Sequence, residues 1–314
     1  MEKNKLKLIF MGTPDFAVPA LTALAEHGNP ISLVVTQPDR PKGRGRKPTP
    51  PPVKTAAEKL GLPVLQPDGV KTDVFYQTII EHHPDLLIVV AFGHILPKRI
   101  LEIPVFGAIN VHASLLPKYR GPAPIQWAII NGEQETGVTT MLMDSGLDTG
   151  EILLSAKTPV QSDDTAGTLH DRLADQGGKL LRETIAALEA GSLTPTPQDH
   201  GAASYAPMLK KSDGRIDWSQ PADNIERQVR GMNPWPLAHC FYENRRLNIY
   251  RVDVRPATQE AAPGTILPGF SGELRVAAGR DAVSILEIQA ASGKRLNIRD
   301  FLSGNELPEG HVLQ

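Results

Sequence analysis

Three polar side chains near the middle of the chain could together catalyse an acyl transfer. Asn110 and His112 lie two residues apart in a strand-like run, so they point to the same face of that strand. Asp148 follows in a loop that can return to them. An amide can donate to a developing oxyanion, an imidazole can move a proton, and a carboxylate can fix the tautomer and charge of the imidazole. The set contains no nucleophile, which indicates that the substrate brings its own.

The residues around this set form longer motifs. Ser-Leu-Leu-Pro stands at 114–117, Tyr-Arg-Gly-Pro at 119–122 and Asp-Ser-Gly-Leu-Asp-Thr-Gly at 144–150. Together with Asn-Val-His at 110–112, these strings resemble the folate-dependent formyltransferases, which use 10-formyltetrahydrofolate. The segments at 9–17 and 136–144 resemble the members of that family that formylate the methionyl group of initiator tRNA. The resemblance continues to the C-terminus.

The resemblance implies a mechanism for the three polar residues. The α-amino group of the methionyl ester would attack the formyl carbon carried on N10 of the folate. Asn110 would stabilise the tetrahedral oxyanion, and His112 would assist the proton transfers. Asp148 would hold His112 and raise its proton affinity. Each of these side chains could instead be a structural residue at a strand end, but the attached motifs favour catalysis.

The resemblance also implies a folate pocket and no metal. Asp144 would help to shape the pterin site, although it could be a plain strand-end residue. Phe92, Gly93, Ile95 and Leu96 follow a buried strand expected at 86–91, so they could line an apolar pterin pocket or belong to the core. The turn expected to lie against the folate consists of Ser114, Leu115, Leu116 and Pro117.

Alternating apolar runs and amphipathic helices predict how these residues are positioned. The pattern indicates a Rossmann-like α/β domain with a parallel sheet, in which ligands bind beyond the carboxyl ends of the strands. A helix expected at 165–190 is followed by a proline-rich stretch and then by short extended runs that suggest a small β-barrel. The resemblance agrees, because the family carries a barrel similar to an OB-fold. We therefore expect a catalytic domain at 1–190, a linker at 191–208 and a tRNA-binding barrel at 209–314.

A basic, proline-rich segment lies between residues 38 and 54. It holds six prolines and six basic residues against one acid, Asp39. It could be a solvated loop, but a stiff basic arm is suited to phosphate contacts, and the resemblance implies that it approaches the acceptor stem of the tRNA. The residues expected to contact tRNA are Arg40, Lys42, Arg44, Arg46 and Lys47.

The amino-acid composition limits the possible binding surfaces and the cellular setting of the protein. The net charge is −2, and the segment after residue 207 is almost neutral, so a nucleic-acid surface there must come from arrangement. The one cysteine, Cys240, allows no internal disulfide and favours a cytoplasmic enzyme, and no apolar run approaches a membrane span. The family suggests a monomer. Two rival functions stay open: a formyltransferase acting on an amino-sugar nucleotide or glycinamide ribonucleotide, and a non-catalytic RNA-binding protein.

Overall fold

The computed structural model describes residues 5–42, 47–257 and 259–314. The chain divides into two compact units. The first comprises Met1–Pro124, Glu135–Pro159 and His170–Ala206, and the second comprises Ile125–Gln134, Val160–Leu169 and Pro207–Gln314. No helix in the described residues is long and apolar enough to cross a membrane.

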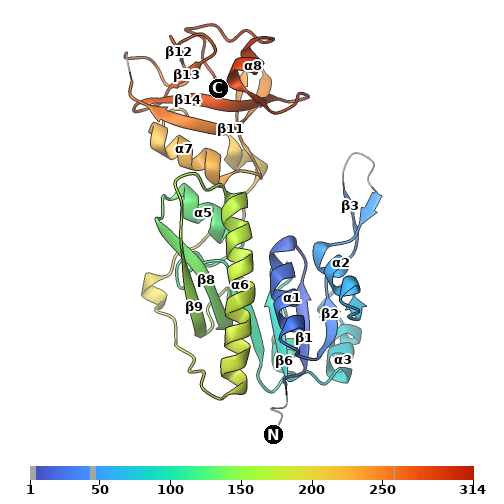
Figure 1. The fold of residues 1–314 in the computed structure, drawn as a ribbon. Helices are drawn as coiled ribbons and strands as arrows, with labels where there is room; N and C mark the ends of the chain where they lie inside the picture. The colour runs from blue at the N-terminus through green and yellow to red at the C-terminus, as the bar shows by residue number, and fades with distance from the viewer. Residues whose placement is uncertain (1–4, 43–46, 258) are drawn as a thin grey trace. The chain divides into compact units, whose positions relative to one another are not determined.

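The first unit is built on one large sheet (Figure 1). Within the described residues it has seven strands in the order β5-β2-β1-β6-β7-β8-β9. The five strands from β5 to β7 are parallel to their neighbours, whereas β8 and β9 run antiparallel. The strands are β1 (Leu8–Gly12), β2 (Ile31–Val35), β5 (Val64–Leu65), β6 (Leu86–Val90), β7 (Ala108–His112), β8 (Glu135–Leu142) and β9 (Ile152–Pro159).

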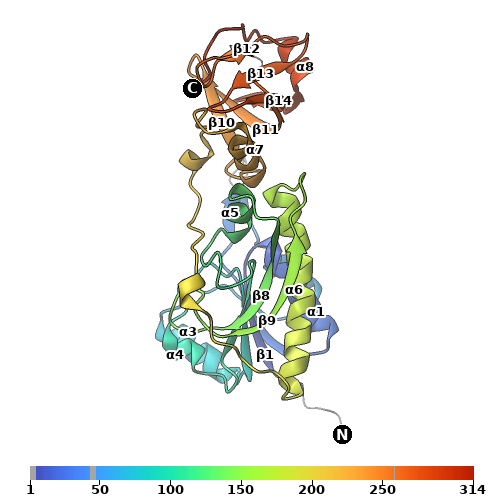
Figure 2. The same cartoon turned by 90° about the vertical axis from the view of Figure 1, so that its left-hand side faces the viewer.

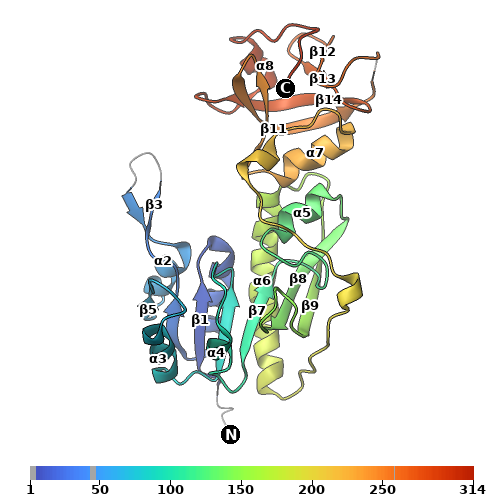
Figure 3. The same ribbon diagram turned by 180° about the vertical axis from the view of Figure 1, so that it is seen from behind.

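Helices cover both faces of this sheet. Figures 1 and 3 show α1 and α6 on one face and α3 and α4 on the other. On the first face, Thr140 of β8 and Thr184 of α6 are joined by a buried hydrogen bond of 2.8 Å. On the second face, Phe75 of α3 and Ile100 of α4 pack into an apolar core with β1, β2 and β6. The helices are α1 (Val18–Glu26), α2 (Pro52–Lys59), α3 (Asp73–Glu81), α4 (Lys98–Leu101), and α6 (Ala166–Glu189).

The strand expected at 86–91 is present as β6, which spans Leu86–Val90. The β6 strand has five consecutive buried residues, as expected of a strand covered on both faces. The antiparallel direction of β8 and β9 is the main addition to the expected parallel sheet. No helix separates β8 from β9, only the loop that carries Asp148, and such a connection joins antiparallel neighbours.

A short hairpin stands apart from the large sheet in Figure 3. It consists of β3 (Arg40–Lys42) and β4 (Lys47–Thr49), whose outer residues Arg40 and Thr49 face each other across the pair. Periodicity did not predict these strands, because proline-rich segments lack the apolar alternation of a buried strand. The basic segment is therefore a two-stranded element rather than a plain loop.

In its described residues the second unit contains an antiparallel sheet together with α5, α7 and α8, and Figure 2 shows its strands closely grouped. Its described strands follow the order β10-β11-β14-β13-β12, with β15 paired to β14. This arrangement and the parallel sheet of the first unit confirm the expected fold class. The elements are α5 (Pro124–Ile130), α7 (Ala222–Gly231), β10 (Ala238–Tyr242), β11 (Arg245–Arg255), β12 (Ile266–Leu267), β13 (Leu274–Ala277), β14 (Ala282–Ala290), β15 (Leu296–Asn297) and α8 (Ile298–Leu302).

Cys240 lies in the core of this second sheet. Its side chain is fully buried in β10, and burial raises the pKa of its thiol to about 12. A thiol with so high a pKa remains protonated and unreactive at neutral pH. Cys240 is therefore a packing residue.

Candidate active site

Two of the three polar residues singled out by the sequence, His112 and Asp148, lie together at the carboxyl end of β7. His112 is the last residue of that strand, and its Nδ1 lies 3.7 Å from Oδ2 of Asp148. Both side chains are largely buried, with 8% and 12% of their surface exposed. The distance is too long for a hydrogen bond but falls within the range of an ion pair if the imidazole is protonated.

The other imidazole nitrogen is also engaged. His112 Nε2 lies 2.9 Å from the carbonyl oxygen of Tyr119. A carbonyl oxygen can only accept, so Nε2 carries the hydrogen and Nδ1 is the nitrogen left to take or give a proton. An imidazolium would then have an acceptor on one side and a carboxylate on the other.

Asn110 lies on the same face of β7, two residues before His112. It is half-buried, and its carboxamide makes no hydrogen bond to the part of the chain that the structure describes. The backbone register pairs Asn110 with Met141 and His112 with Thr139 of β8. The Asn110 amide is thus held in the middle of β7, and within the described residues its donors stay free for a substrate oxygen.

The loop between β8 and β9 is shaped to bring Asp148 back to His112. Asp148 has a positive φ of 53°, a left-handed conformation that aspartate tolerates better than most residues. Its Oδ2 accepts a hydrogen bond of 2.7 Å from the backbone N–H of Gly121. A Cβ atom on Gly150 would lie 1.7 Å from the carbonyl oxygen of Leu142, so only glycine allows the loop to close there.

The Ser-Leu-Leu-Pro turn is fixed by Thr139, a buried residue of β8. The Thr139 hydroxyl donates to the carbonyl oxygen of Ser114 at 2.7 Å and accepts from the N–H of Leu116 at 3.2 Å. The Ser114 hydroxyl itself donates to the carbonyl oxygen of Lys118 at 2.6 Å. Sequence analysis did not find Thr139, because a threonine in a strand carries no signal for the turn that it will meet.

The residues after β6 are divided between core and surface. Phe92 and Leu96 are buried in the apolar core, whereas 81% of the Ile95 side chain is exposed. The carbonyl oxygen of Phe92 accepts hydrogen bonds from Thr13 at 3.0 Å and from Gln37 at 3.1 Å, which ties this segment to the ends of β1 and β2. A folate contact through these residues remains a prediction.

Asp144 and Gly93 play local roles in the backbone. Asp144 is exposed, and its carboxylate accepts hydrogen bonds from Thr149 and from the N–H of Gly146, so it stabilises the loop that carries Asp148. Gly93 has a positive φ of 80°. Gly93 follows the carboxyl end of the parallel strand β6, where the pterin site is expected, whereas Asp144 follows the antiparallel β8, whose last residues pair with the amino end of β7.

The basic hairpin presents a surplus of positive charge. Arg40 and Lys47 are exposed, and Lys42 pairs with Lys47 in the hairpin register. The one acid, Asp39, receives hydrogen bonds from Gln66 and from Lys54, and these lower the pKa of its carboxyl below the usual value. Arg44 and Arg46 lie outside the described residues. The acid of the segment is therefore already neutralised by Lys54, which leaves Arg40 and Lys47 for an external anion.

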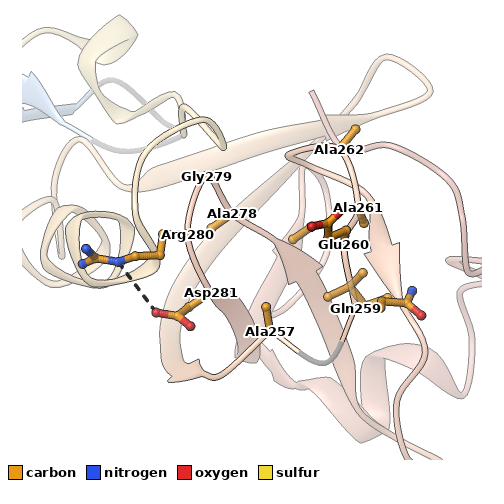
Figure 4. Close-up of a pocket in the computed structure, with 11 residues that line it drawn as sticks. Ala257, Gln259, Glu260, Ala261, Ala262, Ala278, Gly279, Arg280 and Asp281 are labelled. Atoms are coloured by element: carbon orange, nitrogen blue, oxygen red, sulfur yellow. Dashed lines mark ion pairs between the residues drawn. The ribbon is translucent and has the colours of Figure 1, made fainter.

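A cavity of about 790 Å³ lies in the second unit. Figure 4 shows Glu260 and Asp281 among the residues that line it. Arg280, which also lines it, pairs with Asp281 at 3.8 Å and with Asp223 at 3.6 Å. Because its cation is paired with acids, this pocket offers no free charge for a phosphate.

Comparison with known families defines the class of the protein. The sequence model of the family "Formyl transferase" matches residues 5–185, and that of "Formyl transferase, C-terminal domain" matches residues 208–306. An N-formyltransferase from Helicobacter canadensis, in complex with folinic acid and dTDP-3-aminofucose, has a similar fold. The TM-score is 0.64 at 18% identity, over 93% of this chain and 100% of that chain. These matches define a formyltransferase with an N-terminal and a C-terminal domain.

Relatives with higher sequence identity show which group of formyltransferases the chain belongs to. The methionyl-tRNA formyltransferase of Citrifermentans bemidjiense is 51% identical over 98% of this chain and 96% of its own length. That of Desulfotalea psychrophila is 50% identical over 100% of this chain and 97% of its own length. The chain belongs to the methionyl-tRNA formyltransferase family. The resemblance found in the motifs is thereby confirmed.

Proposed function

We propose that this chain transfers the formyl group of 10-formyltetrahydrofolate to the free amino group of methionyl-initiator tRNA, giving N-formylmethionyl-tRNA for translation initiation. The observation that carries the proposal is the identity of about half of the residues, over nearly the full length, with relatives named for this activity. The approach of Asp148 to His112 at the end of β7, with Asn110 on the same face of that strand, supports it, because these groups suit formyl transfer.

In the proposed reaction, Asn110 acts on the formyl oxygen. The methionyl nitrogen forms a bond to the formyl carbon, and negative charge develops on the oxygen of that group. The Asn110 amide, which has no partner among the described residues, would donate to this oxygen. The bond between the formyl carbon and N10 of the donor then breaks and restores the carbonyl group.

In the proposed reaction, His112 transfers protons and Asp148 stabilises the protonated imidazole. The attacking nitrogen loses a proton and the departing folate nitrogen gains one, so a group that takes and returns a proton lowers both barriers. Nδ1 of His112 is suited to this role because Nε2 is engaged with the Tyr119 carbonyl. While the imidazole holds the extra proton, the Asp148 carboxylate at 3.7 Å would stabilise its charge.

The residues at the strand ends fit a folate donor. A pterin is flat, with apolar faces and a hydrogen-bonding edge, and it needs exposed apolar side chains beside backbone groups. Ile95 and Leu147 are large, exposed apolar residues in the segments after β6 and β8. Ser114, Leu115, Leu116 and Pro117 would contact the donor from the turn that Thr139 fixes, with Phe92, Gly93, Leu96 and Asp144 supporting the pterin site.

The basic hairpin would contact the tRNA. Arg40 and Lys47 are exposed cations on a proline-stiffened element, and phosphate contacts need such side chains at low entropic cost. Lys42, Arg44 and Arg46 complete the proposed set. We further propose that residues 1–190 form the catalytic domain, 191–208 a linker and 209–314 a tRNA-binding domain, and that the enzyme is a cytoplasmic monomer.

Formyl transfer by the purified protein tests the proposal. The protein is incubated with 10-formyltetrahydrofolate and methionyl-tRNA, and formylmethionine is measured after hydrolysis of the ester. Glycinamide ribonucleotide and a dTDP-amino sugar are offered in parallel as acceptors, with His112→Ala as the inactive control. Formylation of an alternative acceptor in place of methionyl-tRNA would indicate the rival enzyme, and RNA binding without any product would indicate a non-catalytic protein.

A further inference from the structure

The segment after α6 returns to the catalytic loop and is attached to it by the buried side chain of Gln198. Gln198 Nε2 donates to the carbonyl oxygens of Asp148, at 2.9 Å, and Gly150, at 2.7 Å. Its Oε1 accepts from Nε and Nη2 of Arg120, at 3.1 and 2.7 Å. Both donors and both lone pairs of the amide are thus used, so the orientation of the amide is fixed.

Arg120 connects Gln198 to Gly121, whose backbone N–H binds the carboxylate of Asp148. The Arg120 side chain is 2% exposed, and its third hydrogen bond to a side chain goes to Nδ1 of His200 at 3.2 Å. These acceptors are neutral. Gly121, the next residue, donates its N–H to Oδ2 of Asp148. Arg120 is therefore linked to the Asp148 backbone through Gln198, and Gly121 binds the Asp148 side chain directly.

The Asp148 backbone needs such support. Its left-handed conformation is uncommon for a residue with a side chain, and such conformations persist where the surroundings hold them. The direction of the carboxylate follows from the backbone dihedrals, so the separation from His112 Nδ1 depends on the two hydrogen bonds that Gln198 donates.

We propose that Gln198 is a positioning residue for formyl transfer, which holds the loop of Asp148 so that its carboxylate faces His112. Gln198 touches neither the reacting atoms nor His112, and it acts through Asp148. The inference rests on the proposed function, because the role of Asp148 in proton transfer belongs to that function.

The replacement Gln198→Glu separates positioning from folding. A glutamate keeps the length of the side chain and both acceptors for Arg120, and it gives the buried guanidinium a negative partner. It loses the two N–H donors to Asp148 and Gly150. We expect kcat for methionyl-tRNA to fall roughly 10- to 100-fold, as for a small misplacement of a catalytic group. The KM for methionyl-tRNA should stay at the wild-type value, and thermal unfolding should show a protein that is folded at the assay temperature.

A double-mutant cycle with Asp148→Asn supplies the second readout. If Gln198 acts through the Asp148 carboxylate, Gln198→Glu should reduce kcat little further once that carboxylate has been removed. A residue that merely held the fold would reduce kcat equally in both backgrounds. If Gln198→Glu does not fold, the same cycle is run with Gln198→Met, which has a similar length and no charge.

Gln176→Glu is the matched control. Gln176 is a half-buried glutamine of α6 that donates to the carbonyl oxygen of Lys157 at 3.1 Å and accepts from Thr158. The same chemical change there should leave kcat unchanged. Wild-type kcat in Gln198→Glu, or additive losses in the cycle, would overturn the inference. A wild-type protein without formyl transfer would instead refute the proposed function.

Discussion

Replacing Asp148 with asparagine removes one negative charge from the candidate active site while nearly preserving the shape of the side chain. The amide oxygen of asparagine can still accept the hydrogen bond from Gly121, so the loop should keep its conformation. The amide cannot stabilise a positive imidazole. Activity should therefore fall without loss of the fold.

The size of the effect follows from the position of the two groups. At 3.7 Å, a unit charge pair is worth about 4 kcal/mol at an effective dielectric constant of about 20, and about 1 kcal/mol at that of water. If the imidazole is fully charged in the transition state, these bounds correspond to a rate reduced roughly 5- to 1000-fold. The low exposure of both side chains places the expected loss toward the larger value.

The assay is the pH dependence of kcat for formylation of methionyl-tRNA, with thermal unfolding measured on the same samples. The pH–rate profile should change along with kcat, because the charge that favours the protonated imidazole is gone. Asp175→Asn is the matched control, since Asp175 is exposed on α6 and its replacement removes the same charge from the surface. Full activity with an unaltered profile in Asp148→Asn would show that Asp148 only shapes the loop.

Three further predictions concern the oxyanion site, the hairpin and the fold. Asn110→Ala and His112→Ala should each reduce turnover by roughly 100-fold or more while folate still binds, as followed by fluorescence quenching; near-normal turnover would remove the residue from the mechanism. Joint replacement of Arg40, Lys42, Arg44 and Arg46 by alanine should raise the KM for methionyl-tRNA and flatten its salt dependence, with folate affinity unchanged; an unaffected KM across a salt series would leave the hairpin a solvated element. The Glu189 side chain is only 6% exposed, and this desolvation by itself would raise its pKa. Hydrogen bonds from the Leu6 N–H and Asn29, together with the Lys5 ammonium, lower the pKa overall. The Glu189 carboxylate therefore contributes fully to stability above the unfolded pKa of 4.5, and this contribution is lost as the pH falls through the lower folded pKa. Glu189→Gln should lower the melting temperature at pH 7 but not at strongly acidic pH. Equal losses of melting temperature at both pH values would refute this linkage.

Local sequence determined much of the framework. The apolar run of β6 indicates a strand buried on both faces, and the periodic leucines of α6 indicate an amphipathic helix. The spacing of apolar residues along the chain shows which faces of an element are buried. The two-residue spacing of Asn110 and His112 also fixed their common face on β7. These features depend on neighbours within a few residues, which a sequence displays directly.

Only the tertiary structure decided which distant groups support the site. Thr139 reaches the turn at Ser114 because β8 lies beside β7, and Gln198 reaches Asp148 because the chain returns to the catalytic loop after α6. The same holds for Phe92, whose position after a strand was compatible with either the pterin site or the core where it packs. Hydrogen-bond partners that are far apart in sequence are set by strand order and by the paths of the connections, and no spacing of residues along the chain encodes these.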